Sequence, residues 1–471
     1  MKKALKKTAW IIGYTLSALG AIALAATIGI TNAAALLVSP APAGLATTVV
    51  PLPAPRYDPS KPTVAILLSN TQTESSDFLM PYAMFSESGA YNVYAVAETR
   101  GLRTLLGAVD VVPQRSFAEL DAQLQQSPDI IVVPFMRDIG SPQNVPVLDW
   151  LRQHGHGPTL LFSWCSGAEV LAASGLIDGK TVTAHWGDID GYEQAYPAVH
   201  WQRGERYIDS GTLLTTGGIT SGVDATLHLL ARRNGQAVAD KVAQALHYPA
   251  SPFVANPHMT QYTKELADSI FIFDLAFTWP KRQTGVWLYD GVGEVDLAAV
   301  DDVYHMSSTN QIYTVSDAPA VVSRNGLQIV PRWQAPNLPT MDRLLVPGGD
   351  GAEQAAARLP DGLGGGAVPV TILQNDQAPV YAFTIALQDL AATHDVPSAV
   401  FAAKRLEVRS PLQLVGSQWP LHLLIIPVLA GMGGATAFGS LVWFIRRAIT
   451  FIRRNRNRAS AQTTQPQIGG A

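Results

Sequence analysis

The sequence predicts an α/β body built on parallel sheets and attached to a membrane at both ends. Short apolar runs of strand type alternate with helical stretches from Thr63 onward. A shorter version of the same pattern restarts near residue 282. Each end of the chain also carries an uncharged apolar stretch longer than the roughly 20 residues that span a bilayer. Together these observations indicate doubly wound α/β domains and two transmembrane helices.

The composition sets limits on size and partners. The chain has 471 residues, 47% of them apolar and 15% charged, which predicts at least two globular units. All 37 Asp and Glu residues lie between Asp58 and Glu407, whereas Lys and Arg cluster at both ends. Because nucleic-acid binding needs a basic surface that neutralises phosphates, the acidic body excludes nucleic acid as a partner.

Residues 1–39 form the first predicted element, a transmembrane helix. No charged side chain lies between Lys7 and Arg56, and residues 8–38 are mostly apolar. The alternative is a signal peptide cut near residues 32–35. The apolar region of a signal peptide is usually only about 7–15 residues long, so the longer stretch favours an uncleaved helix.

Residues 419–446 form the predicted C-terminal transmembrane helix, followed by a basic tail over residues 447–471. Trp419 and Trp443 lie where aromatic side chains meet the membrane interface. A buried core helix is the alternative. Since Lys and Arg clusters stay on the cytoplasmic side, both termini are expected in the cytoplasm and the body outside the cell membrane, with lipid as a partner.

The body divides into four predicted segments. Residues 40–62 form a proline-rich linker. Residues 63–250 form the first α/β domain, which closes on the helical stretches SGVDATLHLLARRNG and QAVADKVAQALHYP. Residues 251–281 form a connector, and residues 282–410 form a truncated second copy.

Two sequence correspondences indicate the second copy. DIIVVP (129–134) aligns with DRLLVP (342–347) at an offset of 213. The closing helices (225–248) align with residues 385–408 at an offset of 160, so the second copy is shorter by 53 residues between these landmarks. The missing region contains the counterpart of Cys165, so the second copy is predicted to lack the chemistry of the first.

Cys165 is the only cysteine, so no intramolecular disulfide forms. In TLLFSWCSGAEVLAASG it follows a predicted strand and precedes small residues and a helix, which is the context of a nucleophile elbow. The N-terminus of the following helix is expected to favour the thiolate. A small buried core cysteine is the alternative.

Two longer stretches resemble a known family. WCSGAEVLAASGLIDGKTVTAHW (164–186) and YIDSGTLLTTGGITSGVDATLHLLAR (207–232) resemble the ThiJ/PfpI family, a branch of the class I glutamine amidotransferase-like superfamily. The nearest resemblance is to isonitrile hydratases and to the sensor halves of AraC-type regulators. It implies a flavodoxin-like sheet with a reactive cysteine at Cys165.

The resemblance also implies partners for the cysteine. Asp77, four positions ahead of Pro81, matches the acidic residue that shares a proton with the thiol, with Glu74 behind it. The backbone N–H of Ser166 would hold a developing oxyanion, and His185 would orient or relay a proton. Asp77 as a helix N-cap is an alternative, and so is a His185 that is merely satisfied by hydrogen bonds.

One loop departs from the family pattern. Family members carry a proline followed by paired glycines before the elbow, but the first copy has Phe135 and Met136 after Pro134. The second copy has the opposite set, because it keeps Pro347-Gly348-Gly349 and Asp296 but has no cysteine. It is therefore interpreted as a degenerate partner domain.

No cofactor or metal is predicted. His154 and His156 lie in a glycine-rich turn with no acid or thiol at ligand spacing, so they are interpreted as loop histidines. The predicted function is action on a small electrophilic substrate as a hydratase, amidohydrolase or glyoxalase-like enzyme. A non-catalytic ligand or redox sensor, or a scaffold, is the alternative, and a homodimer is a further expectation.

Overall fold

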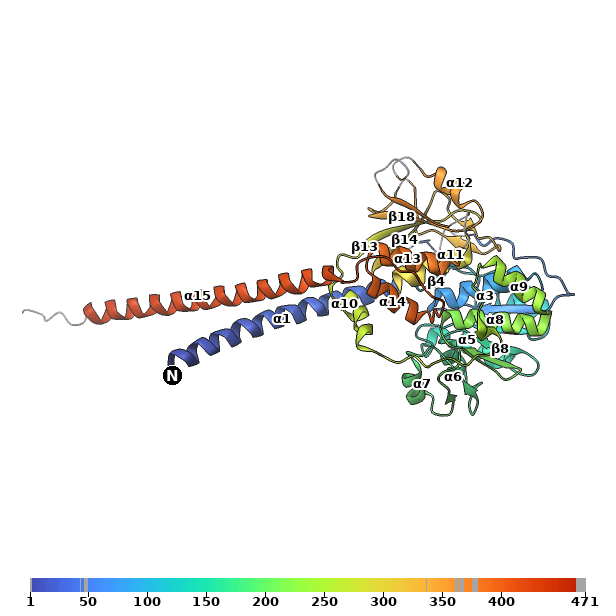
Figure 1. Ribbon diagram of the computed structural model, residues 1–471, viewed down its shortest axis with the longest axis horizontal. Helices are drawn as coiled ribbons and strands as arrows, with labels where there is room; N and C mark the ends of the chain where they lie inside the picture. Colours follow the sequence, from blue (N-terminus) through green and yellow to red (C-terminus); the bar gives the residue numbers. More distant parts are fainter. Residues whose placement is uncertain are drawn as a thin grey trace, which may run out of the picture. The chain divides into compact units, whose positions relative to one another are not determined.

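The computed structural model describes residues 2–42, 44–45, 50–335, 337–360, 363, 368–374 and 380–462 (Figure 1). Contacts divide the chain into two compact units. The first comprises Met1–Ala33, Phe273–Trp279 and Pro420–Ala471, and the second comprises Ala34–Ile272 and Pro280–Trp419.

The first unit is built on two long helices. They are α1 (Lys2–Val38), whose last residues belong to the second unit, and α15 (Ile425–Gln462), which follows the short helix η5 (Leu421–Leu424). Within them, Lys7–Val38 and Leu421–Asn457 are long and apolar enough to cross a membrane. A Cβ at Gly434 would lie 2.4 Å from the carbonyl oxygen of Ser17, so a small residue lets the two helices approach closely.

The first α/β domain contains a seven-stranded sheet in the order β11-β12-β8-β7-β1-β3-β6. All neighbours are parallel except β11 and β12, which confirms the predicted parallel sheet. The predicted strand TVTAHW instead pairs outside this sheet, as β9 (Thr181–Val182) with β10 (His200–Trp201). The strands of the main sheet are β1 (Thr63–Leu67), β3 (Asn92–Ala97), β6 (Arg115–Ser116), β7 (Ile130–Val133), β8 (Leu160–Ser163), β11 (Tyr207–Asp209) and β12 (Leu213–Thr216).

Helices cover both faces of this sheet because its central strands are apolar on both sides. Val64 and Ile66 of β1 belong to one buried cluster, and Ala65 and Leu67 belong to another. The first face packs against α3 (Ser75–Ser88), α8 (Ile219–Asn234) and α9 (Gln236–Ala245). The second packs against α4 (Phe117–Leu124), α5 (Val145–His154) and α6 (Gly167–Ser174).

The second α/β domain contains a five-stranded parallel sheet in the order β17-β14-β13-β18-β19. The same order holds for β6-β3-β1-β7-β8 of the first domain. Its strands are β13 (Arg282–Trp287), β14 (Asn310–Ser316), β17 (Trp333–Gln334), β18 (Arg343–Pro347) and β19 (Val370–Leu373). Its helices are α11 (Glu294–Val300), the π-helical segment η4 (Asp301–His305), α12 (Ala352–Ala357), α13 (Ala382–Thr393) and α14 (Val396–Arg405).

A third, mixed sheet joins the two domains in the order β15-β16-β5-β4-β2. Its strands are β2 (Gln72–Thr73), β4 (Arg103–Leu105) and β5 (Asp110–Val112) of the first domain, and β15 (Val321–Val322) and β16 (Gln328–Val330) of the second. Beside the β16–β5 pair, Arg332 Nε lies 2.6 Å from Asp110 Oδ2 in a buried ion pair. The sequence did not predict this sheet.

The two domains share one large apolar cluster, and a second cluster lies on the other face of the first sheet. Phe78 of α3 and Leu297 of α11 are both buried in the shared cluster, together with residues of both parallel sheets. The connector contains η2 (Pro252–Val254), η3 (Leu266–Asp268) and α10 (Ser269–Phe277). The remaining short elements of the first domain are η1 (Pro142–Asn144) and α7 (Ile189–Ala195).

Candidate active site around Cys165

Cys165 lies in a tight turn between β8 and α6, as the strand-turn-helix pattern predicted. Its φ of 50° is in the left-handed region, which a non-glycine residue occupies only under strain. A Cβ at Gly167 would lie 1.9 Å from the carbonyl oxygen of Val133, so only glycine lets α6 begin here. The backbone N–H of Cys165 donates to Thr216 Oγ1 at 3.0 Å. The turn therefore holds the cysteine at the carboxyl edge of the sheet.

Cys165 lines a cavity of about 370 Å³ that both α/β domains enclose. Residues of the second domain close it from the side of η4 and the end of α14. The first domain contributes Glu74, Leu106, Phe135, Cys165, Ser166, Glu169, His185, Asp188, Tyr192 and Ile219, and the second contributes Asp302, Met306, Arg405 and Leu406. The site is thus incomplete without the second domain.

The two predicted acids lie at the start of α3, and Glu74 is the one on the cavity wall. Glu74 is the N-cap of α3, and its side chain accepts from the backbone N–H of Asp77 at 2.6 Å. Asp77 is fully buried behind it and accepts from the backbone N–H of Phe135 at 3.0 Å. The alternative interpretation of Asp77 as the N-cap is therefore wrong.

The thiol is not poised as a thiolate, contrary to the expectation from the helix N-terminus. Burial raises the pKa of Cys165 well above its usual range, and the nearby carboxyl groups of Asp77 and Glu74 raise it further. Burial likewise raises the pKa values of Glu74 and Asp77. Ionisation of any one of Cys165, Glu74 and Asp77 disfavours ionisation of the other two. The thiol of Cys165 therefore keeps its proton at neutral pH.

His185 lies on the cavity wall with partners at both ring nitrogens. Its Nε2 is 3.0 Å from the carbonyl oxygen of Arg405, and its Nδ1 is 3.4 Å from Asp188 Oδ2. Asp188 Oδ2 also accepts from Ser166 Oγ at 2.6 Å. Burial alone would lower the pKa of His185, but the bond to Asp188 raises it overall. The imidazole is thus oriented towards Asp188 and the second domain.

Only part of the expected oxyanion site is present. The backbone N–H of Phe135 is engaged by Asp77 and cannot serve a substrate. Within the described part of the chain, no acceptor is recorded for the backbone N–H of Ser166. Phe135 stands where family members carry a glycine, and its backbone N–H is not free to bind an oxyanion because it donates to Asp77.

The polar residues of the cavity that escaped the sequence interpretation include Asp188, Asp302 and Arg405. Asp188 follows His185 by three positions in a turn, a spacing that was a usable signal. Asp302 and Arg405 belong to the second copy, and nothing local marked them. Their side chains pair at 2.7 Å, between Arg405 Nη2 and Asp302 Oδ1.

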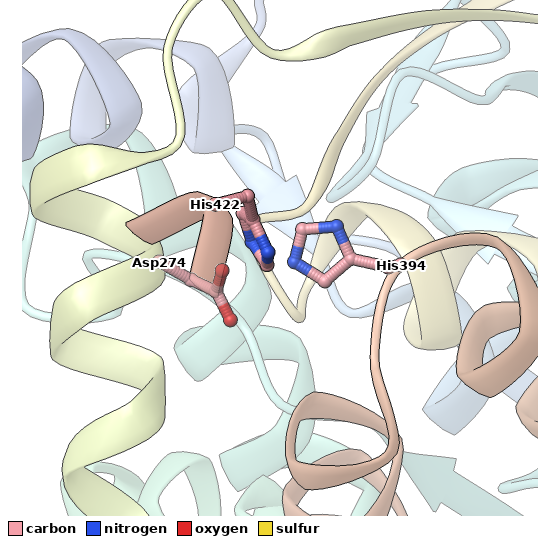
Figure 2. Close-up of side chains that lie close together, drawn as sticks. All are labelled: Asp274, His394 and His422. Atoms are coloured by element: carbon pink, nitrogen blue, oxygen red, sulfur yellow. The ribbon is translucent and has the colours of Figure 1, made fainter. Parts of the chain in front are cut away.

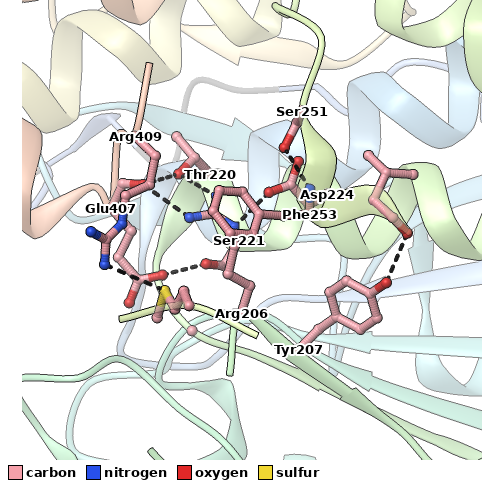
Figure 3. A network of polar contacts seen from close by, with 12 residues as sticks. Arg206, Tyr207, Thr220, Ser221, Asp224, Ser251, Phe253, Glu407 and Arg409 are labelled. Carbon is pink, nitrogen blue, oxygen red and sulfur yellow. Dashed lines mark hydrogen bonds and ion pairs between the residues drawn. The ribbon is translucent and has the colours of Figure 1, made fainter. Parts of the chain in front are cut away.

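A buried polar network anchors the end of α14 on the first domain (Figure 3). Arg206 Nε lies 2.5 Å from Asp224 Oδ2, and Arg206 Nη1 donates to the carbonyl oxygen of Glu407 at 3.1 Å. Thr220 Oγ1 donates to the same carbonyl oxygen at 2.6 Å, and the Ser221 hydroxyl donates to the Glu407 carboxylate. This network holds Arg405, two residues earlier, at the cavity.

His154 is not the loop histidine that the sequence predicted, because it is the last residue of α5 and is buried. His154 Nε2 lies 3.2 Å from Asp121 Oδ1, and its ring packs on Trp150. In the first unit, ligand atoms of Asp274 and His422 lie within 4.8 Å of each other (Figure 2). Figure 2 also draws His394, which belongs to the second unit.

A doubly wound parallel sheet with a cysteine in a strained turn at its carboxyl edge defines the class of the first domain. Residues 62–232, which contain most of the first domain, match the model of the DJ-1/PfpI family.

Similar proteins include enzymes and regulators. The chain is 29% identical over 186 residues to an isonitrile hydratase of Pseudomonas putida, covering 39% of this chain and 77% of the hydratase. It is 33% identical over 98 residues to the HTH-type transcriptional regulator CdhR of Pseudomonas aeruginosa, covering 21% of this chain and 29% of the regulator. A solved ThiJ/PfpI family protein from Pseudomonas syringae has a TM-score of 0.36 and 22% identity, covering 44% of this chain and 86% of that chain.

Proposed function

We propose that the chain is a membrane-anchored DJ-1/PfpI protein whose Cys165 acts on a small electrophilic molecule. The observation that carries this proposal is the strained turn, which presents Cys165 to a cavity lined by both α/β domains with Glu74 on its wall. Strain of this kind persists where the surrounding structure holds it and is concentrated at functional sites.

The proposed chemistry begins with attack of the sulfur on an electrophilic carbon. A carbon–sulfur bond forms, an electron pair moves to the heteroatom of the substrate, and the thiol proton passes through the Glu74 carboxyl group to that heteroatom. The raised pKa of Glu74 suits proton transfer near neutral pH. Water then releases the product from sulfur. For an amide, the adduct then expels its amine and leaves a thioester for water to hydrolyse. For an isonitrile the thiol proton goes instead to the attacked carbon, and for a dicarbonyl a proton shift between its two carbons forms the thioester before hydrolysis.

We further propose that residues 282–410 are a degenerate copy of residues 63–250. The shared strand order and the placement of the aligned segments support this: DIIVVP contains β7 and DRLLVP contains β18. The closing pairs α8–α9 and α13–α14 also correspond. In this proposal the second copy serves as a built-in partner domain, and the homodimer stays a prediction.

The membrane topology is also a proposal. Two apolar helices suggest membrane association, and the basic ends favour two spans with cytoplasmic termini and an extracytoplasmic body. A reporter fused after Ala471 should be active only in the cytoplasm. An externally active fusion would overturn the two-span topology.

A non-catalytic ligand or redox sensor is the second candidate. The raised pKa of Cys165 and the engaged N–H of Phe135 favour it, because both weaken nucleophilic catalysis. In that case the cavity binds its ligand without turnover.

The deciding experiment is intact mass spectrometry of the purified full chain after treatment with iodoacetamide or peroxide, beside Cys165→Ser. We expect modification in the wild type alone. Turnover is then assayed with methylglyoxal, simple isonitriles and amides, with Asp77→Asn and Glu74→Gln as comparisons. Modification without turnover supports the sensor, and an unreactive Cys165 contradicts the proposal.

A further inference from the structure

We propose that the second domain forms the recognition wall of the Cys165 cavity, where Asp302 and Arg405 select an uncharged ligand. The ligand would present a hydrogen-bond acceptor and a donor side by side. This inference rests on the proposed function and names its class of substrate.

The ion pair between Asp302 and Arg405 has one spare polar atom on each side. Arg405 Nη2 donates to Asp302 Oδ1 at 2.7 Å and to the backbone oxygen of Asp302 at 3.0 Å. No partner is recorded, among the described residues, for the buried atoms Arg405 Nε and Asp302 Oδ2. Both residues line the cavity. The pair thus offers one N–H donor and one carboxylate acceptor.

A third such atom belongs to the first domain. Glu74 is 6% exposed, and its Oε1 has no recorded partner in the described part of the chain. Asp302 is fully buried. Buried polar atoms without partners cost free energy, so native proteins seldom leave them unsatisfied. Three of them at one cavity indicate that a polar ligand completes their hydrogen bonds.

The two cationic groups that line the cavity, Arg405 and His185, are each already paired with a carboxylate. Asp302 pairs with Arg405, and Asp188 pairs with His185 at 3.4 Å. Burial raises the pKa values of Glu74 and Glu169, so both carboxyl groups resist ionisation, and burial also raises the pKa of the Cys165 thiol, which is neutral at pH 7. A charged ligand would therefore enter a buried site without an opposite charge, which is costly.

The wall is held in place before a ligand arrives. The carbonyl oxygen of Arg405 contacts His185 Nε2, and the backbone N–H of Thr220 donates to the carbonyl oxygen of Leu406 at 3.2 Å. Arg206 holds the carbonyl oxygen of Glu407. A pre-organised wall loses little entropy on binding, so its donor and acceptor act on specificity.

The corresponding wall of the second cavity, which the first domain supplies, lacks this pair. The offset of 219 that aligns Asp296 with Asp77 aligns Asp302 with Ala83, and the offset of 160 aligns Arg405 with Ala245. Ala83 and Ala245 line a second cavity of about 250 Å³. The ion pair is thus present only where it faces the cysteine, as a recognition role requires.

The test uses three alkylating probes of different charge on the purified full chain: iodoacetamide, iodoacetate and 2-bromoethylamine. Iodoacetamide is neutral and carries an amide acceptor and donor. Modification of Cys165 is followed by intact mass against probe concentration and normalised to the reaction of glutathione. We expect saturation with iodoacetamide and a normalised rate about tenfold or more above both charged probes.

The variants Asp302→Asn and Arg405→Gln and their double variant test the wall. Each should raise the half-saturating concentration of iodoacetamide about tenfold with little change in the maximal rate. Arg324→Gln, at the second cavity, is the matched control and should change neither.

Equal normalised rates for the three probes in the wild type would overturn the inference even if the variants unfold. So would unchanged half-saturation in folded variants. Failure of every probe to modify Cys165 would instead contradict the proposed function.

Discussion

Two cavities of the α/β body, the one at Cys165 and the one at Asp296, carry different parts of the pattern expected for this site. The larger has Cys165 but carries Phe135 where the glycine loop is expected. The smaller keeps Gly349 at a φ of 147°, with Asp296 beside it, but has no cysteine. Neither cavity holds both the cysteine and the glycine pair.

The cavities are nevertheless built in the same way. Arg405 and Leu406, at the end of α14, line the cavity of Cys165. Ala245 and Leu246, at the end of α9, line the cavity of Asp296 in the same way. Each domain therefore closes the site of the other, and the difference between the walls is chemical.

The largest expected effect comes from the anchor of the first wall. Asp224→Ala leaves the buried guanidinium of Arg206 without its carboxylate, which should lower the free energy of unfolding by about 3–5 kcal/mol. Arg203→Ala, which breaks more exposed ion pairs, should cost at most about 1 kcal/mol. Thermal or denaturant unfolding of the full chain compares the two. Equal costs would show that the anchor contributes little.

The elbow predicts the next effect. Gly167→Ala places a Cβ against the carbonyl oxygen of Val133 and should cost about 2–3 kcal/mol through backbone displacement. Gly140→Ala has open space around its Cβ and serves as the matched control. Unfolding curves and iodoacetamide labelling of Cys165 report stability and turn geometry. A variant as stable as the control would contradict the close approach of α6 to β7.

The acids beside the thiol predict a change in reactivity. Glu74→Gln removes a negative charge that raises the pKa of Cys165, so the thiolate fraction should increase. A pKa lower by about one unit would speed iodoacetamide labelling about tenfold at pH 8. Glu294→Gln changes a buried acid at the second cavity and should leave labelling unchanged. The pH dependence of the labelling rate gives the pKa of Cys165. An unchanged labelling rate in Glu74→Gln would contradict an effect of Glu74 on that pKa.

The smallest effect concerns Asp296, whose pKa burial raises to about 6. A raised carboxyl pKa means that stability is fully present below the unfolded value and is lost as the pH rises through about 6. Asp296→Asn cannot lose that stability. The variant should therefore match the wild type near pH 3.5 and exceed it by about 1–2 kcal/mol at pH 8, a range discounted for partial solvent exposure. Parallel melting curves across this range would contradict the burial of Asp296.

The sequence alone determined the central strands of the first sheet and the elbow, because these depend on local patterns. Apolar runs separated by helical stretches predicted β1, β3, β7 and β8, and small residues after Cys165 predicted the turn before α6. The aligned segments predicted the parallel strands of a second domain. Periodicity and turn chemistry act over a few residues, so they can be recognised without the fold.

Only the tertiary structure decided what surrounds the thiol. His185 and Arg405 are 220 positions apart in sequence, and the contact between them exists because α14 packs on the first domain. The same packing brings Asp302 to the cavity, and the fold of the first domain gives the N–H of Phe135 to Asp77. Long-range packing and burial set which donors, acceptors and charges meet, and hence the protonation of Cys165. No local pattern encodes them.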